Sequence, residues 1–237
     1  MNFNRVVIKV GRALVSPDKK GCSGKYIQAI ASFVNKCHQQ KKEVILVSSG
    51  SVSAGRHFIR HGSPIPSIPT KQAMAAVGQM KMMANWQRFF DVPCSQLLIT
   101  HGDLKDRGRY INIKNTLRIL LANGILPIVN ENDTVATEEL KVGDNDNLAA
   151  LVALISEADC FLILSDIDGV YTKDPRTNDD AVMITEISEI TDEIYAMAGT
   201  TNNPIAIGGM KTKIQAAEKS VENGIETYIL NGSDSQV

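Results

Sequence analysis

Apolar and polar positions alternate along the chain in an order that predicts an α/β protein. Six short apolar runs have strand length, at residues 6–10, 43–47, 95–100, 125–129, 160–164 and 225–230. Stretches with apolar positions three or four residues apart predict helices at about 23–40, 70–90, 110–122, 148–155, 188–197 and 210–223. Strands that alternate with helices are joined by right-handed crossovers. The pattern therefore predicts a parallel sheet.

Other segments predict turns and loops. Three prolines between residues 62 and 69 predict a surface loop, and residues 170–176 predict a hairpin or an extended excursion. Residues 199–209 have no periodicity and are also expected to be a loop. Ser23 is the expected N-cap of the first long helix.

Two residues interrupt the apolar runs. Pro127 has no backbone N–H, so it predicts an edge position or a local irregularity in its strand. Lys9 lies within the first run, where a buried ammonium is costly unless it has a partner. Two interpretations stay open for Lys9: it extends to solvent at the strand end, or it meets an anion just beyond the strand.

The predicted helix at 70–90 carries a row of large apolar side chains. Its apolar positions are expected to be Met74, Val77, Met80, Met83 and Trp86. Methionine packs adaptably in irregular apolar surroundings. We therefore expect this row in the core or at a subunit interface rather than at a binding surface.

Composition narrows the possible classes of protein. The 237 residues are 43% hydrophobic and 22% charged, with a net charge of −1, as in a soluble globular protein. Lysines and arginines form no stripe interleaved with aromatic residues, so no nucleic-acid partner is expected. No repeat or linker divides the chain, which predicts a single domain over residues 1–237.

The cysteines and apolar segments predict a cytosolic protein. The four cysteines are widely spaced without a Cys-x-x-Cys pair, which predicts free thiols in a reducing compartment. Residues 6–10 contain a lysine and are too short for a signal-peptide core. No apolar stretch approaches membrane-spanning length, so no membrane partner is expected.

Short polar residues gather where two predicted elements begin or end. Asn-Glu-Asn-Asp at 130–133 follows the fourth strand, and Gly-Asp-Asn-Asp-Asn at 143–147 leads into the helix at 148–155. Helix capping accounts for one or two of these residues, not for all of them. Ligands of open α/β sheets bind beyond the carboxyl ends of the strands. The two clusters therefore predict a binding site.

Glycine-rich segments with nearby lysines indicate phosphate chemistry. Ser48–Gly55 follows the second strand and predicts either an anion site or a flexible turn. Lys9 precedes Gly11, and Lys211 and Lys213 follow a Gly-Gly pair. Separated lysines beside such loops suit phosphoryl transfer. No P-loop, Gly-x-Gly-x-x-Gly fingerprint, nucleophile triad or zinc-binding histidine pair occurs.

Six motifs resemble, in order and spacing, those of the amino acid kinase family. They lie at residues 7–11, 48–55, 130–133, 143–147, 164–171 and 208–213. The segments at 130–133, 141–147 and 106–112 resemble in particular the members that phosphorylate L-glutamate. The resemblance covers nearly the whole chain. It implies a three-layer αβα sandwich with a mainly parallel central sheet of about eight strands.

The resemblance also implies a reaction. It is the ATP-dependent phosphorylation of the side-chain carboxylate of L-glutamate to L-glutamyl 5-phosphate, with Mg²⁺, as the first step of proline biosynthesis. A homo-oligomer, either a dimer or a tetramer, is implied as well. The acceptor carboxylate is ionised at neutral pH, so no general base is required.

The family's motifs assign roles to individual residues. Lys9 and Lys213 are expected to stabilise the transferring phosphoryl group, and Asp146 is expected to hold both lysines. The residues expected to bind glutamate are Ser49, Asn130, Asp133 and Asn145. Those expected to bind ATP are Lys9, Gly11, Ser165, Asp166, Ile207, Gly208, Gly209, Met210, Lys211, Thr212 and Lys213. No residue is assigned to a resident metal.

Four departures from the family pattern accompany the match. Arg12 and Ala13 stand where small hydroxyl residues are usual, and Arg12 could add charge or could block the phosphates. Ile207 and Ser165 each replace a threonine. The sequence ends at Val237, so the domain is expected to lack its last C-terminal strand and a PUA domain.

Those departures leave two alternatives to a glutamate kinase. One is a weakly active or non-catalytic homologue that binds glutamate or a partner protein. The other is a kinase for another small acid such as aspartate. The presence of both Lys9 and Lys213 favours an active kinase, because a pure binding module needs neither lysine.

Overall fold

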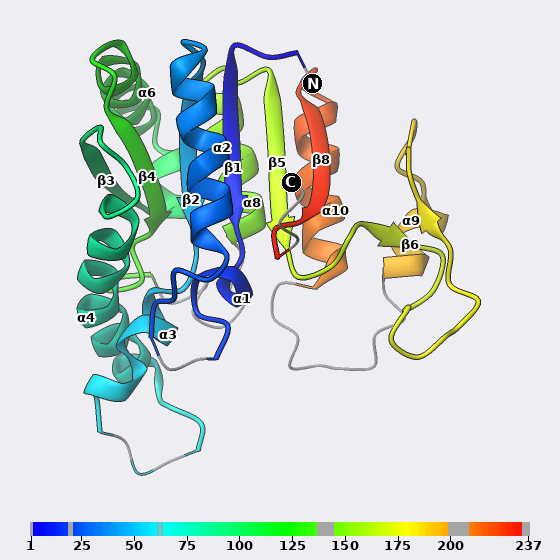
Figure 1. Cartoon of the computed structure of the whole chain (residues 1–237), viewed down its shortest axis with the longest axis horizontal. Coiled ribbons are helices and arrows are strands. Elements are labelled where there is room, and N and C mark those ends of the chain that lie inside the picture. Colours follow the sequence, from blue (N-terminus) through cyan, green and yellow to red (C-terminus); the bar gives the residue numbers. More distant parts are fainter. Residues whose placement is uncertain are drawn as a thin grey trace.

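A parallel six-stranded sheet forms the centre of the computed structural model, which describes residues 2–18, 21–60, 62, 64–136, 145–198 and 209–233 (Figure 1). The strand order is β3-β4-β2-β1-β5-β8, and all neighbouring strands are parallel. The strands are β1 (Arg5–Val10), β2 (Glu43–Ser48), β3 (Cys94–Ile99), β4 (Leu126–Glu131), β5 (Cys160–Ser165) and β8 (Glu226–Asn231). Each lies within two residues of a predicted strand.

Helices cover both faces of this sheet because side chains of each strand alternate between the faces. Val6 and Ile8 of β1 pack with α2 (Ile27–Gln39) and α4 (Ile68–Gln87). Val7 packs on the opposite face with α6 (Arg107–Ala122), α8 (Asn145–Ile155) and α10 (Met210–Val221). Figure 1 shows α2 in front of the sheet and α8 behind it. The three-layer αβα sandwich is confirmed.

The expected strand number of about eight was too high for this sheet. The other two described strands, β6 (Val170–Tyr171) and β7 (Met183–Ile184), form a separate antiparallel ribbon. The ribbon confirms the predicted hairpin, but its second strand begins later than residue 176. It lies beside the helix α9 (Asp192–Ala198), on a small apolar cluster of its own that includes Val170 and Ala198.

Pro127 lies in a strand that pairs on both sides, so the predicted edge position was wrong. The N–H of Leu126 donates to the Pro93 carbonyl, on the side of β3. The nitrogen of Pro127 therefore faces the side of β2, since successive residues alternate. Pairing of β2 with β4 starts only at Ile128. The missing donor thus falls before that ladder begins.

The methionine row of α4 does not share one face. Met74 and Trp86 are buried, as is Met82, whereas Met80 is 75% exposed. Positions spaced by three residues drift around a helix of 3.6 residues per turn. Met80 is therefore not in the core of this chain, whereas the alternative of a subunit interface stays a prediction. The face that packs inward contains Met74, Ala75, Gly78, Gln79, Met82, Asn85 and Trp86.

Helix starts and short helices were the least predictable features. The N-cap of α2 is Tyr26 rather than Ser23, whose hydroxyl accepts from the N–H of Lys25 instead. The helices α1 (Arg12–Val15), α3 (Ser51–Gly55) and α5 (His101–Lys105) and the 3-10 turn η1 (Arg56–Phe58) were not predicted. Elements of three to five residues are too short to show a helical period.

Two glycines bring α3 against α4. A Cβ on Gly78 would lie 1.8 Å from the Ser51 carbonyl oxygen, and one on Gly55 would lie 1.9 Å from the Met74 carbonyl oxygen. Neither contact is possible for a larger residue. The close approach holds α3 in place beyond the carboxyl end of β2.

The cysteines form no disulfide bonds in this fold. All four cysteines are unpaired. Burial raises the pKa of the Cys160 thiol to about 12 and that of Cys22 to about 11. Within the described parts of the chain, no helix combines the length and apolar character needed to cross a membrane.

Candidate active site

A pocket of about 300 Å³ opens at the carboxyl ends of the central strands. Its walls come from β1, β4 and β5, from α1, α3 and α4, and from the first turns of α8 and α10. Parallel strands bring their carboxyl ends to one edge of the sheet. Segments that are far apart in the sequence therefore meet in this one pocket.

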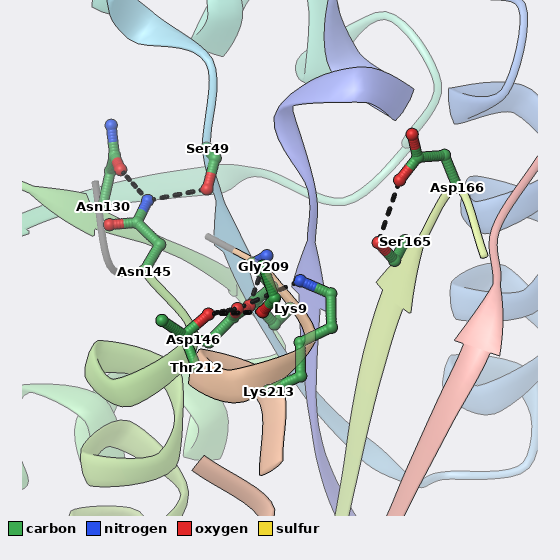
Figure 2. Close-up of polar contacts among 10 residues, drawn as sticks. All are labelled: Lys9, Ser49, Asn130, Asn145, Asp146, Ser165, Asp166, Gly209, Thr212 and Lys213. Atoms are coloured by element: carbon green, nitrogen blue, oxygen red, sulfur yellow. Dashed lines mark hydrogen bonds and ion pairs between the residues drawn. The ribbon is translucent and has the colours of Figure 1, made fainter. Parts of the chain in front are cut away.

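Two lysines share one buried carboxylate at the base of the pocket (Figure 2). The Nζ of Lys9 lies 2.5 Å from Oδ1 of Asp146, and the Nζ of Lys213 lies 3.1 Å from its Oδ2. The hydroxyl of Thr212 donates to the same Oδ2 at 2.8 Å. All three charged residues are at least 94% buried. This group, Lys9, Asp146 and Lys213, is called the lysine cluster below.

Local structure explains how these three side chains meet. Lys9 is on the same face of β1 as Val7, opposite Val47 and Ile163 of the neighbouring strands. That face packs on α8, whose first turn carries Asp146. The first turn of α10 follows Gly209 and carries Lys213. Lys9 is thus buried beside an anion, and the alternative that it extends to solvent was wrong.

Asp146 stays ionised in spite of its burial. Burial raises the pKa of its carboxyl, but Lys9, Lys213 and the donated hydrogen bonds lower it more, so that the pKa falls to about 2. Two ammonium groups therefore face one carboxylate. The lysine cluster carries an excess of positive charge toward the pocket, as a phosphoryl group in transfer requires.

Hydroxyl and amide groups form a second cluster in the pocket, consisting of Ser49, Asn130 and Asn145 (Figure 2). The Nδ2 of Asn145 donates to Oγ of Ser49 at 2.9 Å and to Oδ1 of Asn130 at 2.8 Å. We call it the amide cluster. Its donors and acceptors are uncharged, in contrast to those of the lysine cluster.

The amide cluster is supported from the protein interior. Asn130 donates to Oε1 of Gln79 at 3.0 Å, and Gln79 donates to Gln96 at 3.2 Å. Gln79 and Asn130 are both buried. These successive hydrogen bonds determine which end of each amide faces which neighbour. Nearby, the Ser51 hydroxyl donates to Oδ2 of Asp133 at 2.5 Å.

The carboxyl end of β5 forms another wall of the pocket. The Ser165 hydroxyl donates to Oδ1 of Asp166 at 3.2 Å. The N–H of Gly11 donates to the Leu164 carbonyl at 3.0 Å, and a Cβ on Gly11 would lie only 3.2 Å from that oxygen. A glycine therefore lets the chain leave β1 directly alongside β5.

The structure brings most of the predicted site residues together. Ten of them line the pocket: Lys9, Gly11, Ser49, Asn130, Asp133, Asn145, Asp146, Ser165, Asp166 and Lys213. Their roles toward ligands stay predictions.

Of the remaining residues predicted to bind the nucleotide, those that the structure describes do not line the pocket, and they lie in different surroundings. Thr212 bonds to Asp146 and to the Gly209 carbonyl. Met210 packs on the cluster with Val170 beneath the ribbon, and Lys211 is exposed away from the pocket lining. Ile207 and Gly208 are outside the described residues, as are Gly143 and Asp144 of the segment at 143–147.

Sequence reasoning missed several residues of the lining. Lys71 is the clearest example, because it lies in the first turn of α4, where the pattern showed only an apolar row. Gly50, Ser51, Val52 and Ser53 belong to the predicted Ser/Gly segment, but they were not individually assigned. Arg12, by contrast, was singled out from the sequence as a residue near the phosphates, and it does line the pocket.

Among the residues that the structure describes, the side-chain donors do not form a cage for a resident metal ion. Over the described ranges, no group of three or more His, Cys, Asp or Glu side chains could hold one. Mg²⁺ is commonly bound through one or two carboxylates together with substrate phosphates.

Comparison with known proteins shows close relatives along nearly the whole chain. It is 54% identical to "Glutamate 5-kinase 1" of Pseudoalteromonas translucida over 232 residues, which are 98% of this chain and 63% of the relative. It is 54% identical to "Glutamate 5-kinase" of Salinibacter ruber over 234 residues, which are 98% of this chain and 62% of the relative. The chain thus spans less than two thirds of the length of these curated relatives.

Solved structures and a family model agree on the fold. A substrate complex of isopentenyl phosphate kinase superimposes with a TM-score of 0.66 at 18% identity, covering 99% of this chain and 93% of that one. UMP kinase from Bacillus anthracis superimposes with a TM-score of 0.63 at 13% identity, covering 99% of this chain and 89% of that one. Residues 4–231 match the model of the amino acid kinase family. The chain belongs to the amino acid kinase family.

Proposed function

We propose that this chain phosphorylates the side-chain carboxylate of L-glutamate with ATP, giving L-glutamyl 5-phosphate and ADP. One observation carries the proposal: the lysine cluster and the amide cluster lie in the same pocket. The first suits a phosphoryl group and the second suits a small polar acceptor. The names of the two relatives at 54% identity, both glutamate 5-kinases, support glutamate as that acceptor.

The proposed reaction needs no proton transfer. A carboxylate oxygen of glutamate attacks the γ-phosphorus of ATP. The bond from that phosphorus to the oxygen bridging to the β-phosphate breaks, and ADP leaves with the electron pair. Negative charge spreads over the oxygens of the transferring group. Lys9 and Lys213 face the pocket with two ammonium groups, while Asp146 holds them in position.

Acceptor recognition is proposed to use opposite charges at the pocket wall. Asp133 offers a carboxylate to the substrate's α-ammonium, and Lys71 offers an ammonium to its α-carboxylate. Asn145 and Ser49 orient the reacting carboxylate through the amide cluster. On this proposal Mg²⁺ enters as part of the MgATP substrate. The enzyme would act in the cytosol as a homo-oligomer, in the first step of proline biosynthesis.

The decisive experiment traps the acyl phosphate as a hydroxamate. With ATP, Mg²⁺ and hydroxylamine, the chain should convert glutamate to the hydroxamate. The substitution Lys213→Ala should lower turnover well over tenfold while glutamate still binds, because contacts to transition-state charge contribute several kcal/mol. Lys36→Ala, on the exposed side of α2, is the matched control and should keep full turnover.

Three outcomes would contradict the proposal in different ways. Glutamate binding without hydroxamate formation would point to a non-catalytic homologue. Faster turnover with aspartate than with glutamate would show that aspartate is the preferred acceptor. Undiminished turnover in Lys213→Ala would remove that lysine from the reaction.

A further inference from the structure

Arg12 is a cation of the pocket wall that has no protein partner among the described residues. It is exposed, lines the pocket and takes part in no hydrogen bond or ion pair of its side chain with any described residue. Lys9 and Lys213 also line the pocket, but they are buried, and each forms an ion pair with Asp146. Of these three cations, Arg12 can therefore bind an incoming anion without releasing an ion pair in the described structure.

The fold places Arg12 between the two sides of the pocket. It directly follows Gly11, whose N–H bonds to the end of β5, and a Cβ on Gly11 would lie 3.8 Å from the Nζ of Lys9. On the other side, a Cβ on Gly50 would lie 3.2 Å from Cγ1 of Val15, in the same short helix α1. The helix that carries Arg12 is thus held between the segment at residues 49–50 and the β5 end.

Arg12 contributes to a net positive charge of the described lining. The lining holds four cationic side chains and three carboxylates: Lys9, Arg12, Lys71 and Lys213, with Asp133, Asp146 and Asp166. Without Arg12 these charges cancel. ATP is strongly anionic, and a neutral lining would give it little attraction. Removing any one of the four cations would have the same effect on this sum, but Lys9 and Lys213 are already paired with Asp146, whereas Arg12 is exposed toward an incoming anion.

We propose that Arg12 binds the β- and γ-phosphates of the nucleotide and so acts as a third phosphate-binding cation beside Lys9 and Lys213. This inference rests on the proposed function in that ATP is the ligand. A guanidinium presents several N–H donors in a planar fork that matches two phosphate oxygens at once. The opposite reading, in which Arg12 obstructs the phosphates, gives the reverse result in the test below.

The test measures nucleotide binding by titration calorimetry without any acceptor. Arg12→Gln should bind ATP about tenfold more weakly than the unsubstituted chain, as expected for losing a charge-assisted hydrogen bond. Its affinity for AMP should be unchanged, because AMP lacks the two outer phosphates. The ATP affinity of Arg12→Lys should lie between those of Arg12→Gln and the unsubstituted chain. Arg88→Gln, an exposed arginine at the far end of α4, is the matched control and should bind ATP normally.

The salt dependence adds a second readout. ATP affinity should fall less steeply with added salt in Arg12→Gln than in the unsubstituted chain or Arg88→Gln, because one attractive charge has been removed. Equal or tighter ATP binding by Arg12→Gln would overturn the inference, and so would an equal loss for ATP and AMP. The unsubstituted chain could also bind ATP more tightly than Arg12→Gln and yet form no hydroxamate from glutamate. That result would support this inference and reject only the proposed function.

Discussion

The lysine cluster and the amide cluster lie in one pocket but differ in what holds them. Three charges meet in the first, with Lys9 and Lys213 against Asp146 in a setting almost closed to solvent. Neutral donors and acceptors meet in the second, and their hydrogen bonds continue inward to Gln79. A buried charge depends on its partner far more than a neutral amide does. The two clusters should therefore respond differently to equivalent substitutions.

The largest expected effect follows from removing the shared carboxylate. Asp146→Asn leaves two buried ammonium groups without a counter-charge, which should cost roughly 3–5 kcal/mol of stability. Turnover should fall with it, because the lysines lose their position. Urea unfolding and the hydroxamate assay measure the two effects. An unchanged unfolding midpoint would mean that the lysine cluster is held by something other than charge.

A surface ion pair provides the matched control for that substitution. Asp180 pairs with Lys173 at 2.5 Å, but both side chains are more than half exposed. Asp180→Asn should leave the urea unfolding midpoint almost unchanged, since solvent screens such pairs. The contrast between the two aspartates isolates the contribution of burial.

Acid titration tests the same cluster with a smaller effect. The folded-state pKa of Asp146 is about 2, below its ordinary value of 3.8. A lowered pKa stabilises the fold above the unfolded-state pKa, and that stability is lost as the pH falls through the folded-state pKa. The stability difference between the unsubstituted chain and Asp146→Asn should stay constant above about pH 5 and shrink between about pH 4 and 2. A difference that stays constant down to pH 2 would contradict the lowered pKa.

The smallest expected effect concerns the amide cluster. Asn145→Ala removes the donor to both Ser49 and Asn130, but leaves no unpaired charge. The KM for glutamate should rise about tenfold, in line with the loss of a few neutral hydrogen bonds. The KM for ATP in the same variant is the internal control and should be unchanged. A selective change in the KM for ATP would assign Asn145 to the nucleotide side and remove the distinction between the clusters.

The glycine contact between α3 and α4 shows where sequence reasoning reached its limit. The Ser/Gly segment was recognised as a turn or an anion site, yet nothing in its pattern indicated contact with a helix beginning at Ile68. The same contact brings Lys71 of α4 to the pocket wall. Helical periodicity reports which side of a helix is apolar, and it carries no information on which polar residue reaches a distant loop.

Strand positions were predictable for a physical reason. Strands buried on both faces are mostly apolar, so the central strands β1, β2, β4 and β5 stand out as nearly continuous apolar runs. The edge position offered for Pro127 was wrong because the missing N–H was assessed without knowing where pairing with β2 begins. Met80 was misread because a row spaced by three residues was taken as a single helix face.

The sequence by itself determined the strands, the parallel α/β class and the two polar segments that contribute to the site. Local pattern and residue chemistry were sufficient for these, because alternation and capping depend on near neighbours. The family resemblance had already assigned Asp146 to hold Lys9 and Lys213. The tertiary structure decided the contacts themselves: both lysines reach that carboxylate, Asn145 bridges Ser49 and Asn130, and Arg12 lines the same pocket. These contacts join residues from different strands and helices. Their distances depend on sheet register and helix packing, which no local segment specifies.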